Sequence, residues 1–261
     1  MSDAVEKNPW SELKSLTNAR IALGRAGNSL PTAPLLAFNL SHAQSRDAVH
    51  QPFDAEALRR DIEAAGWATL GAHSAAPDRQ HYLRRPDLGR RLSDESRAQL
   101  AAHGEHGDAP DIVFVVGDGL SAFAAAKQAL PLLLAVRPRL AGWKIGPVVV
   151  ARQARVALGD EIGELLRAKL VAMLIGERPG LSSPDSLGVY LTHAPKVGCH
   201  DALRNCISNV RPEGLPYEAA AHKLHYLMTH ARRLGLTGVG LKDDSDAVLP
   251  EAMEAERIGA D

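Results

Sequence analysis

A glycine-rich turn in the middle of the chain is the first candidate for chemistry. Gly117, Gly119 and Ala122 fit the G-x-G-x-x-A pattern of a dinucleotide-binding turn, because an apolar run precedes them and a helical pattern follows. Such a site also needs an acidic residue about 20 positions further on, to bind the ribose hydroxyls. No Asp or Glu occurs from Gly119 through Gly159, and Asp118 would place a negative charge beside the pyrophosphate. We therefore interpret the turn as a tight strand-to-helix connection, with a nucleotide-dependent oxidoreductase of the NAD type as the alternative.

Two basic clusters could bind an anion. The acid-free stretch carries six cations: Lys127, Arg137, Arg139, Lys144, Arg152 and Arg155. They could face a phosphate-bearing ligand or an acidic patch on another chain, or they could be solvated surface cations. The second cluster consists of Arg84, Arg85, Arg90 and Arg91. Acidic residues lie close to it and the formal net charge is −1, so a structural or subunit-facing role is favoured over binding to nucleic acid or to a membrane.

Motifs for other chemistries are missing from the sequence. It contains no G-x-S-x-G, no Cys–His pairing pattern and no zinc-ligand spacing, so we expect no catalytic residue and no metal site. The segment from Met1 to Glu6 lacks the plan of a secretory signal, which favours reduced thiols at Cys199 and Cys206. No apolar run approaches the roughly 20 residues that span a bilayer. These features, with 45% apolar and 23% charged residues, are typical of a soluble protein of the cytosolic type.

Helix start signals dominate the first hundred residues. Helices are expected to begin at Asn8–Pro9, Thr32, Asp54 and Ser93. The first should present Trp10, Leu13, Thr17 and Ile21 on one face, and the second should bury a stripe of Leu36, Leu40 and Ala43. A polar segment at 103–110 then marks a boundary. Residues 1–108 are therefore predicted to form a smaller helical N-terminal domain.

Residues 109–261 alternate between strand and helix patterns. Strands are predicted at 112–116, 145–150, 170–175 and 187–191, and helices at 122–136, 161–167 and 217–234. Strands that alternate with helices form largely parallel sheets with right-handed crossovers. The sequence thus predicts an α/β fold: a mostly parallel, Rossmann-like sheet with flanking helices, preceded by the helical domain.

Several blocks of sequence, taken in order, resemble the small subunit of ethanolamine ammonia-lyase. The central blocks are Arg155–Val156, Asp160–Glu164, Gly176–Leu181, Asp185–Leu187 and Cys206–Asn209. Further blocks are Gly24–Gly27, Arg85–Leu92, Asp118–Ser121 and Pro216–Ala221. The resemblance covers residues from about 18 to 235, and the order and spacing of the blocks make it far more specific than any one of them.

The resemblance implies a lyase that converts ethanolamine to acetaldehyde and ammonia with adenosylcobalamin. In that family the large subunit, a barrel, holds the substrate and performs the radical chemistry. The small subunit packs against it, in a hetero-oligomer with several copies of each chain, and closes over the cobalamin. The resemblance also implies the bacterial cytoplasm, sometimes a microcompartment. Carried over by motif, the cobalamin contacts of this chain fall at Val156, Glu177 and Cys206.

The sequence itself gives each of these three positions a second interpretation. Glu177 follows a predicted strand at its carboxyl end, where α/β sheets bind ligands, and its carboxylate could accept N–H bonds from the carboxamides that rim a corrin. Otherwise it is solvated or paired with Arg178. Cys206 is expected at another strand end, or as a small buried apolar residue. Val156 could contribute backbone groups or apolar contact, or could be part of the core.

The mode of cobalamin binding is expected to be base-on. Many cobalamin proteins replace the lower base of the cofactor with a histidine from a D-x-H-x-x-G motif, and this sequence has no such motif. His222, His225 and His230 lie on one predicted helix, where a solvated polar face is the favoured interpretation. A non-enzymatic interaction module, built on the N-terminal helices and the arginine cluster, is the remaining alternative.

Overall fold

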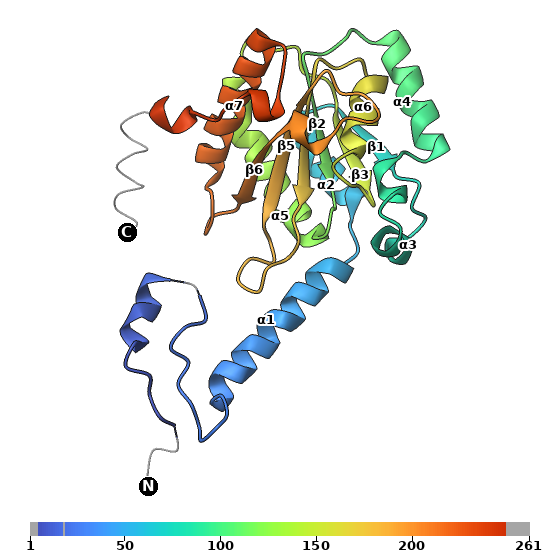
Figure 1. Cartoon of the computed structure of the whole chain (residues 1–261). Helices are drawn as coiled ribbons and strands as arrows, with labels where there is room; N and C mark the ends of the chain where they lie inside the picture. The colour runs from blue at the N-terminus through green and yellow to red at the C-terminus, as the bar shows by residue number, and fades with distance from the viewer. Residues whose placement is uncertain (1–4, 18, 249–261) are drawn as a thin grey trace.

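A six-stranded sheet forms the centre of the protein, as seen in a computed structural model that describes residues 5–17 and 19–248 (Figure 1). The strands are β1 (Thr69–His73), β2 (Ile112–Gly117), β3 (Val148–Arg152), β4 (Leu170–Gly176), β5 (Leu187–His193) and β6 (Arg204–Val210). Their order across the sheet is β1-β3-β2-β4-β5-β6. The first four in this order are parallel, whereas β5 and β6 each run antiparallel to the preceding strand.

Helices cover both faces of the sheet (Figure 1). The α-helices are α1 (Thr32–His50), α2 (Ala55–Ala64), α3 (Arg79–Arg84), α4 (Asp94–His106), α5 (Ala122–Val136), α6 (Leu158–Leu165) and α7 (Tyr217–Leu234). Short 3-10 turns occupy Ser11–Leu16, Leu88–Arg90, Arg137–Arg139, Asp201–Leu203, Gly238–Gly240 and Ser245–Val248. Within the described residues, no helix is both long and apolar enough to cross a membrane.

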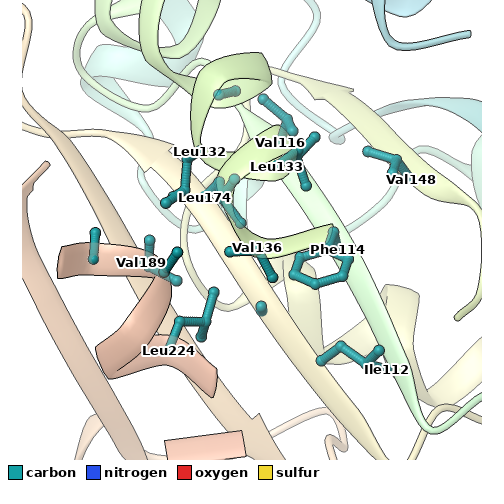
Figure 2. Close-up of a cluster of buried hydrophobic side chains, with 14 of the residues drawn as sticks. Ile112, Phe114, Val116, Leu132, Leu133, Val136, Val148, Leu174, Val189 and Leu224 are labelled. Atoms are coloured by element: carbon teal, nitrogen blue, oxygen red, sulfur yellow. The ribbon is translucent and has the colours of Figure 1, made fainter. Parts of the chain in front are cut away.

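Side chains of successive residues in the buried strands point to opposite faces of the sheet, so the protein has two separate hydrophobic cores. On β2, Ile112, Phe114 and Val116 face α2, α5 and α7, whereas Val113 and Val115 face α4 and α6. Figure 2 shows the first core, where residues of β2 and β4 pack against side chains of α5 and α7. All six residues of β2 are buried, as a strand covered on both faces requires. The layers are therefore helix, sheet, helix.

Most predictions for the second half of the chain are confirmed. The α/β fold is present, and α5 and α7 begin and end at the predicted residues. β2, β4 and β5 contain the predicted strands. In the first half, Asp54 and Ser93 cap α2 and α4, because their side chains accept bonds from the N–H groups of Ala57 and Ser96.

Two predictions about the elements of the fold need correction. The first hundred residues are not all helical, since β1 pairs with β3. The second predicted strand lies at 148–152 and the following helix begins at 158, each about three residues from its predicted start. The sheet is mostly parallel, as predicted, but β4 and β5 are joined by ten residues without a helix and so form an antiparallel pair. The strand expected near Cys206 is β6, whose bounds were not predicted, because only three of its seven residues are buried.

Two predictions for the first fifty residues are wrong, because these segments have few groups to pack against. The first helix is only the 3-10 turn Ser11–Leu16, with no buried residue. The second helix, α1, begins at Thr32 as predicted, but the stripe that was expected to be buried is exposed, with 61% of both Leu36 and Leu40 accessible. Helix propensity forms α1, but the helix projects away from the sheet and has little to bury against (Figure 1).

Two expectations extend beyond the described residues. Met1–Ala4, part of the segment lacking a secretory plan, lie outside them, as does the end of the predicted second domain after residue 248. The domain boundary at residues 108/109 stays a prediction.

Candidate functional site

Two adjoining cavities lie beside the loop that follows β3, and the larger one opens at the carboxyl edge of the parallel strands. The larger, about 450 Å³, is lined by Tyr82, Gly119, Leu120, Arg155, Val156, Ile175, Gly176, Glu177, Arg178, Tyr190 and Ser208. The second, about 410 Å³, is lined by Arg90, Arg155, Val156, Ala157, Tyr190, Cys199, His200, Asp201 and Arg204. Arg155, Val156 and Tyr190 belong to both. This edge is where open α/β sheets bind ligands.

Glu177 lies directly after β4, as predicted, and its carboxylate is fixed by groups from β6 and from the residue that precedes β5. The hydroxyls of Ser186 and Ser208 donate to its two oxygens, and the N–H of Asn209 donates to Oε2 at 3.3 Å. Arg178 makes no bond to it. Of the two sequence-based alternatives, pairing with Arg178 is therefore wrong, and the carboxylate is half-buried rather than freely solvated.

A bulge and a glycine make room for this carboxylate. The β5–β6 register shifts between Leu187 and Val189, so that one extra residue of β6 lies opposite Gly188. Asn209 in that bulge has a positive φ of 60°. A Cβ on Gly188 would come within 2.8 Å of Glu177 Oε1, so only glycine leaves space for the side chain.

Cys206 lies in the middle of β6, not at a strand end as expected. It is directly opposite Tyr190 in the β5–β6 register, on the sheet face that α6 leaves uncovered, and the residue is exposed. Desolvation raises the pKa of the Cys206 thiol. The pKa of Tyr190 is raised to about 12, mainly by desolvation of its hydroxyl and to a smaller extent by the neighbouring Cys206. Both groups are therefore protonated at neutral pH. They can donate hydrogen bonds, but neither is an activated nucleophile.

Val156 lies in the loop between β3 and α6, half-buried at the junction of the two cavities. The loop is held by Asp118, which is 1% exposed and accepts bonds from the N–H groups of Gln153 (3.0 Å) and Ala154 (2.9 Å). Asp118 also lies 3.4 Å from Nη1 of Arg79. The acidic residue inside the glycine-rich turn thus positions the loop that carries Val156.

The glycine-rich turn itself is packed against the end of β4. Gly119 has a φ of +54°, and a Cβ there would overlap the carbonyl oxygen of Gly176. Leu120 N–H donates to that same oxygen at 2.9 Å. Ser121 caps α5 by accepting from Ala124 N–H, and its hydroxyl donates to Pro184 O. The glycines therefore serve close packing rather than a pyrophosphate cradle, which supports the interpretation as a tight connection.

Sequence reasoning missed Tyr190, Ser186 and Ser208. Tyr190 links all three predicted positions, because it lines both cavities beside Val156 and lies opposite Cys206. The alternation of β5 was a usable signal: Leu187, Val189 and Leu191 pack in one core, so Tyr190 must point to the other face. The serines carried no comparable signal, because their role depends on the bulge.

Fold and site together define an α/β protein with an open, polar cavity at the carboxyl edge of its sheet. The comparisons with known proteins agree with this class. The family model "Ethanolamine ammonia-lyase light chain" matches residues 7–242. The ethanolamine ammonia-lyase small subunit of Ralstonia nicotianae is 57% identical over 251 residues, 95% of this chain and 93% of the relative. That of Azotobacter vinelandii is 58% identical, covering 92% and 90%, and that of Pseudomonas aeruginosa is 55% identical, covering 99% and 96%.

The chain belongs to the ethanolamine ammonia-lyase light chain family. The resemblance inferred from the sequence blocks is thereby confirmed, and the chain is a subunit of a carbon–nitrogen lyase. That enzyme depends on adenosylcobalamin, and the description as a small subunit implies a large-subunit partner.

Proposed function

We propose that this chain binds adenosylcobalamin at its interface with the large subunit, through Val156, Glu177 and Cys206, and contributes no catalytic side chain. The observation that carries the proposal is the Glu177 carboxylate, which three donors fix at the rim of a cavity of about 450 Å³. Each carboxylate oxygen can accept about two hydrogen bonds. Oε1 receives one bond from the protein, so it retains an acceptor site.

The groups around the cavity fit the rim of a corrin. Its carboxamide arms carry N–H donors and carbonyl acceptors. Glu177 offers the acceptor, and the protonated hydroxyl of Tyr190 offers a donor beside the apolar side chain of Val156. Adenosylcobalamin supplies radical chemistry when it is bound, by homolysis of its cobalt–carbon bond. The residues of this chain bind and orient the cofactor, and they exclude solvent from one side of it.

The open side of the cavities is where we place the large subunit. Cys206 and Ser208 are exposed on the sheet face beyond α6, so this face offers polar groups to a second chain. The proposed assembly contains several copies of each chain. Its proposed location is the bacterial cytoplasm, within a microcompartment where the organism builds one. The relatives with the small-subunit description are bacterial proteins.

Reconstitution tests this function. The chain is co-produced with its large-subunit partner, and ammonia release from ethanolamine is measured with and without adenosylcobalamin. We expect release to require both chains and the cofactor, because neither chain encloses the cofactor alone. An assembled pair that neither binds adenosylcobalamin nor releases ammonia would refute the proposal, and bound NAD on the purified pair would favour an oxidoreductase instead.

The cofactor is proposed to bind base-on, with its own dimethylbenzimidazole on cobalt. The three histidines of α7 lie on a helix that covers the opposite face of the sheet from Tyr190 and Cys206. His200 is the histidine that lines the second cavity. The electron paramagnetic resonance spectrum of the Co(II) state should therefore be the same for the unaltered pair and for His200→Gln. Hyperfine coupling from a histidine nitrogen would contradict base-on binding.

A further inference from the structure

One arginine at the site has cationic and hydrogen-bonding capacity that the protein does not use. Four of the six cations in the acid-free stretch pair with carboxylates: Lys127 with Asp185, Arg139 with Glu218, Lys144 with Asp108, and Arg152 with Glu56. Arg137 donates to the carbonyls of Ala65 and Gly66. Arg155 alone of the six lines both cavities, and it pairs with no carboxylate among residues 5–17 and 19–248.

The guanidinium of Arg155 is held in place without its charge being neutralised. It stacks on the Tyr82 ring, 4.3 Å from the centroid, and Nη2 donates to Tyr82 O at 3.3 Å. Its backbone N–H donates to Gly89 O at 2.8 Å. The Nε donor is buried with no acceptor. A planar donor that is preorganised in this way, with most of its N–H groups free, is suited to an oxyanion.

The second cavity places further positive groups near Arg155. Arg90, in the other basic cluster, lines this cavity and forms no ion pair within the described residues, whereas Arg85 and Arg91 both pair with Asp87. Within the part of the chain that the structure describes, the backbone N–H groups of Val156 and Ala157, which precede α6, donate no hydrogen bond to a backbone carbonyl. Free N–H groups at a helix start favour an anion.

The charge balance of the two cavities leaves one positive charge. The lining residues include four guanidinium groups, those of Arg90, Arg155, Arg178 and Arg204. Three carboxylates oppose them: Glu177 and Asp201 in the lining, and Asp160 bound behind Arg204. A monoanion would neutralise the excess, whereas a dianion would exceed it.

We infer that Arg155 and Arg90 form a subsite for a phosphodiester, the single negative charge of the nucleotide loop of cobalamin. This inference rests on the proposed function. In this arrangement Glu177 accepts from the neutral carboxamides on one side of Val156, and the two arginines receive the phosphodiester on the other side. The subsite thus recognises the part of the cofactor that carries the lower base, which connects it with base-on binding.

The test compares two ligands on the assembled two-chain complex. Adenosylcobalamin contains the phosphodiester, and adenosylcobinamide lacks it together with the nucleotide. Dissociation constants are measured for the unaltered complex, Arg155→Gln, Arg90→Gln and the control Arg84→Gln, an exposed arginine of the same cluster that lines neither cavity. We expect adenosylcobalamin affinity to fall about tenfold in Arg155→Gln and about threefold in Arg90→Gln, with cobinamide affinity and the control unchanged. Arg155→Lys, which keeps the charge, should recover part of the loss.

Salt dependence gives a second readout that does not depend on cobinamide binding. If the arginines receive the phosphodiester, the fall in adenosylcobalamin affinity with added salt should be shallower in both variants. Equal losses for the two ligands, or unchanged affinity with an unchanged salt slope, would overturn the inference. Weaker assembly with unchanged cofactor affinity would also overturn it, because the arginines would then face an acidic patch on the large chain. If the unaltered complex binds no adenosylcobalamin, the proposed function fails first.

Discussion

Replacing Arg204 by methionine is expected to lower the free energy of unfolding by about 3–5 kcal/mol. Arg204 and Asp160 are each 2% exposed at the side chain and form a two-pronged pair, with Nη2 2.7 Å from Oδ2. The same guanidinium donates to Thr192 Oγ1 (3.0 Å) and to Cys199 O (2.8 Å). It therefore joins α6, β5, β6 and the loop before β6. Without it, a buried carboxylate loses both charge-assisted bonds, which urea unfolding should detect.

A second substitution separates this buried charge from loss of packing. In Arg204→Met with Asp160→Leu the unpaired carboxylate is gone, and most of the stability should return, because an apolar pair of similar volume often replaces a buried ion pair at little cost. Arg25→Met, which breaks the exposed pair with Glu6, should leave the urea midpoint nearly unchanged. If Arg204→Met unfolds at the midpoint of the unaltered protein, the pair does not have the role described.

Gly119→Ala is expected to destabilise the protein by about 2–4 kcal/mol, and to weaken cofactor binding as well. Its φ of +54° is unfavourable for a residue with a side chain, and the new Cβ would overlap the carbonyl oxygen of Gly176. That carbonyl belongs to backbone, so relief requires moving the end of β4. Glu177 is the next residue, so its carboxylate would move with it. Thermal or urea unfolding and adenosylcobalamin affinity both report the change.

Gly142→Ala is the matched control for this prediction. Gly142 also has a positive φ, +78°, but no atom lies within 4 Å of the added Cβ. It should therefore show only the conformational cost of about 1–2 kcal/mol, with cofactor affinity unchanged. Equal effects on stability and affinity from both substitutions would mean that the contact between Gly119 and Gly176 does not hold the site.

The helices and strands that were predicted well from the sequence are those whose local pattern of apolar residues matches the side chains that are buried in the structure. α5 and α7 combine an apolar face with a clear start, and β2 is a continuous apolar run covered on both faces. β1 was not predicted and the bounds of β6 were not defined, because both strands lie at the edges of the sheet. β1 includes a glycine and is half-buried throughout, and β6 is exposed at Cys206, Ser208 and Asn209. Edge strands lack the apolar pattern that reveals central ones.

The site was predictable in its location and not in its geometry. The position of Glu177 after a buried strand indicated the edge of the sheet where the candidate site lies, and the family blocks supplied Val156 and Cys206 as candidate contacts. The anchoring of Glu177 depends on the bulge opposite Gly188, a register shift between two strands that are sequentially distant from it. Such a shift is set by tertiary pairing, so no local pattern around Glu177 could indicate it.

The central claim is that the Glu177 edge of this chain contacts the cofactor. The measurement that tests it most directly is the dissociation constant of adenosylcobalamin for the two-chain complex, with Glu177→Gln compared with the unaltered chain. The control is Glu105→Gln, an exposed carboxylate on α4 that lines neither cavity. We expect Glu177→Gln to lose about 1–3 kcal/mol of binding free energy, the scale of one charge-assisted contact, and the control to lose none. Equal affinities in all three complexes would contradict the proposed site.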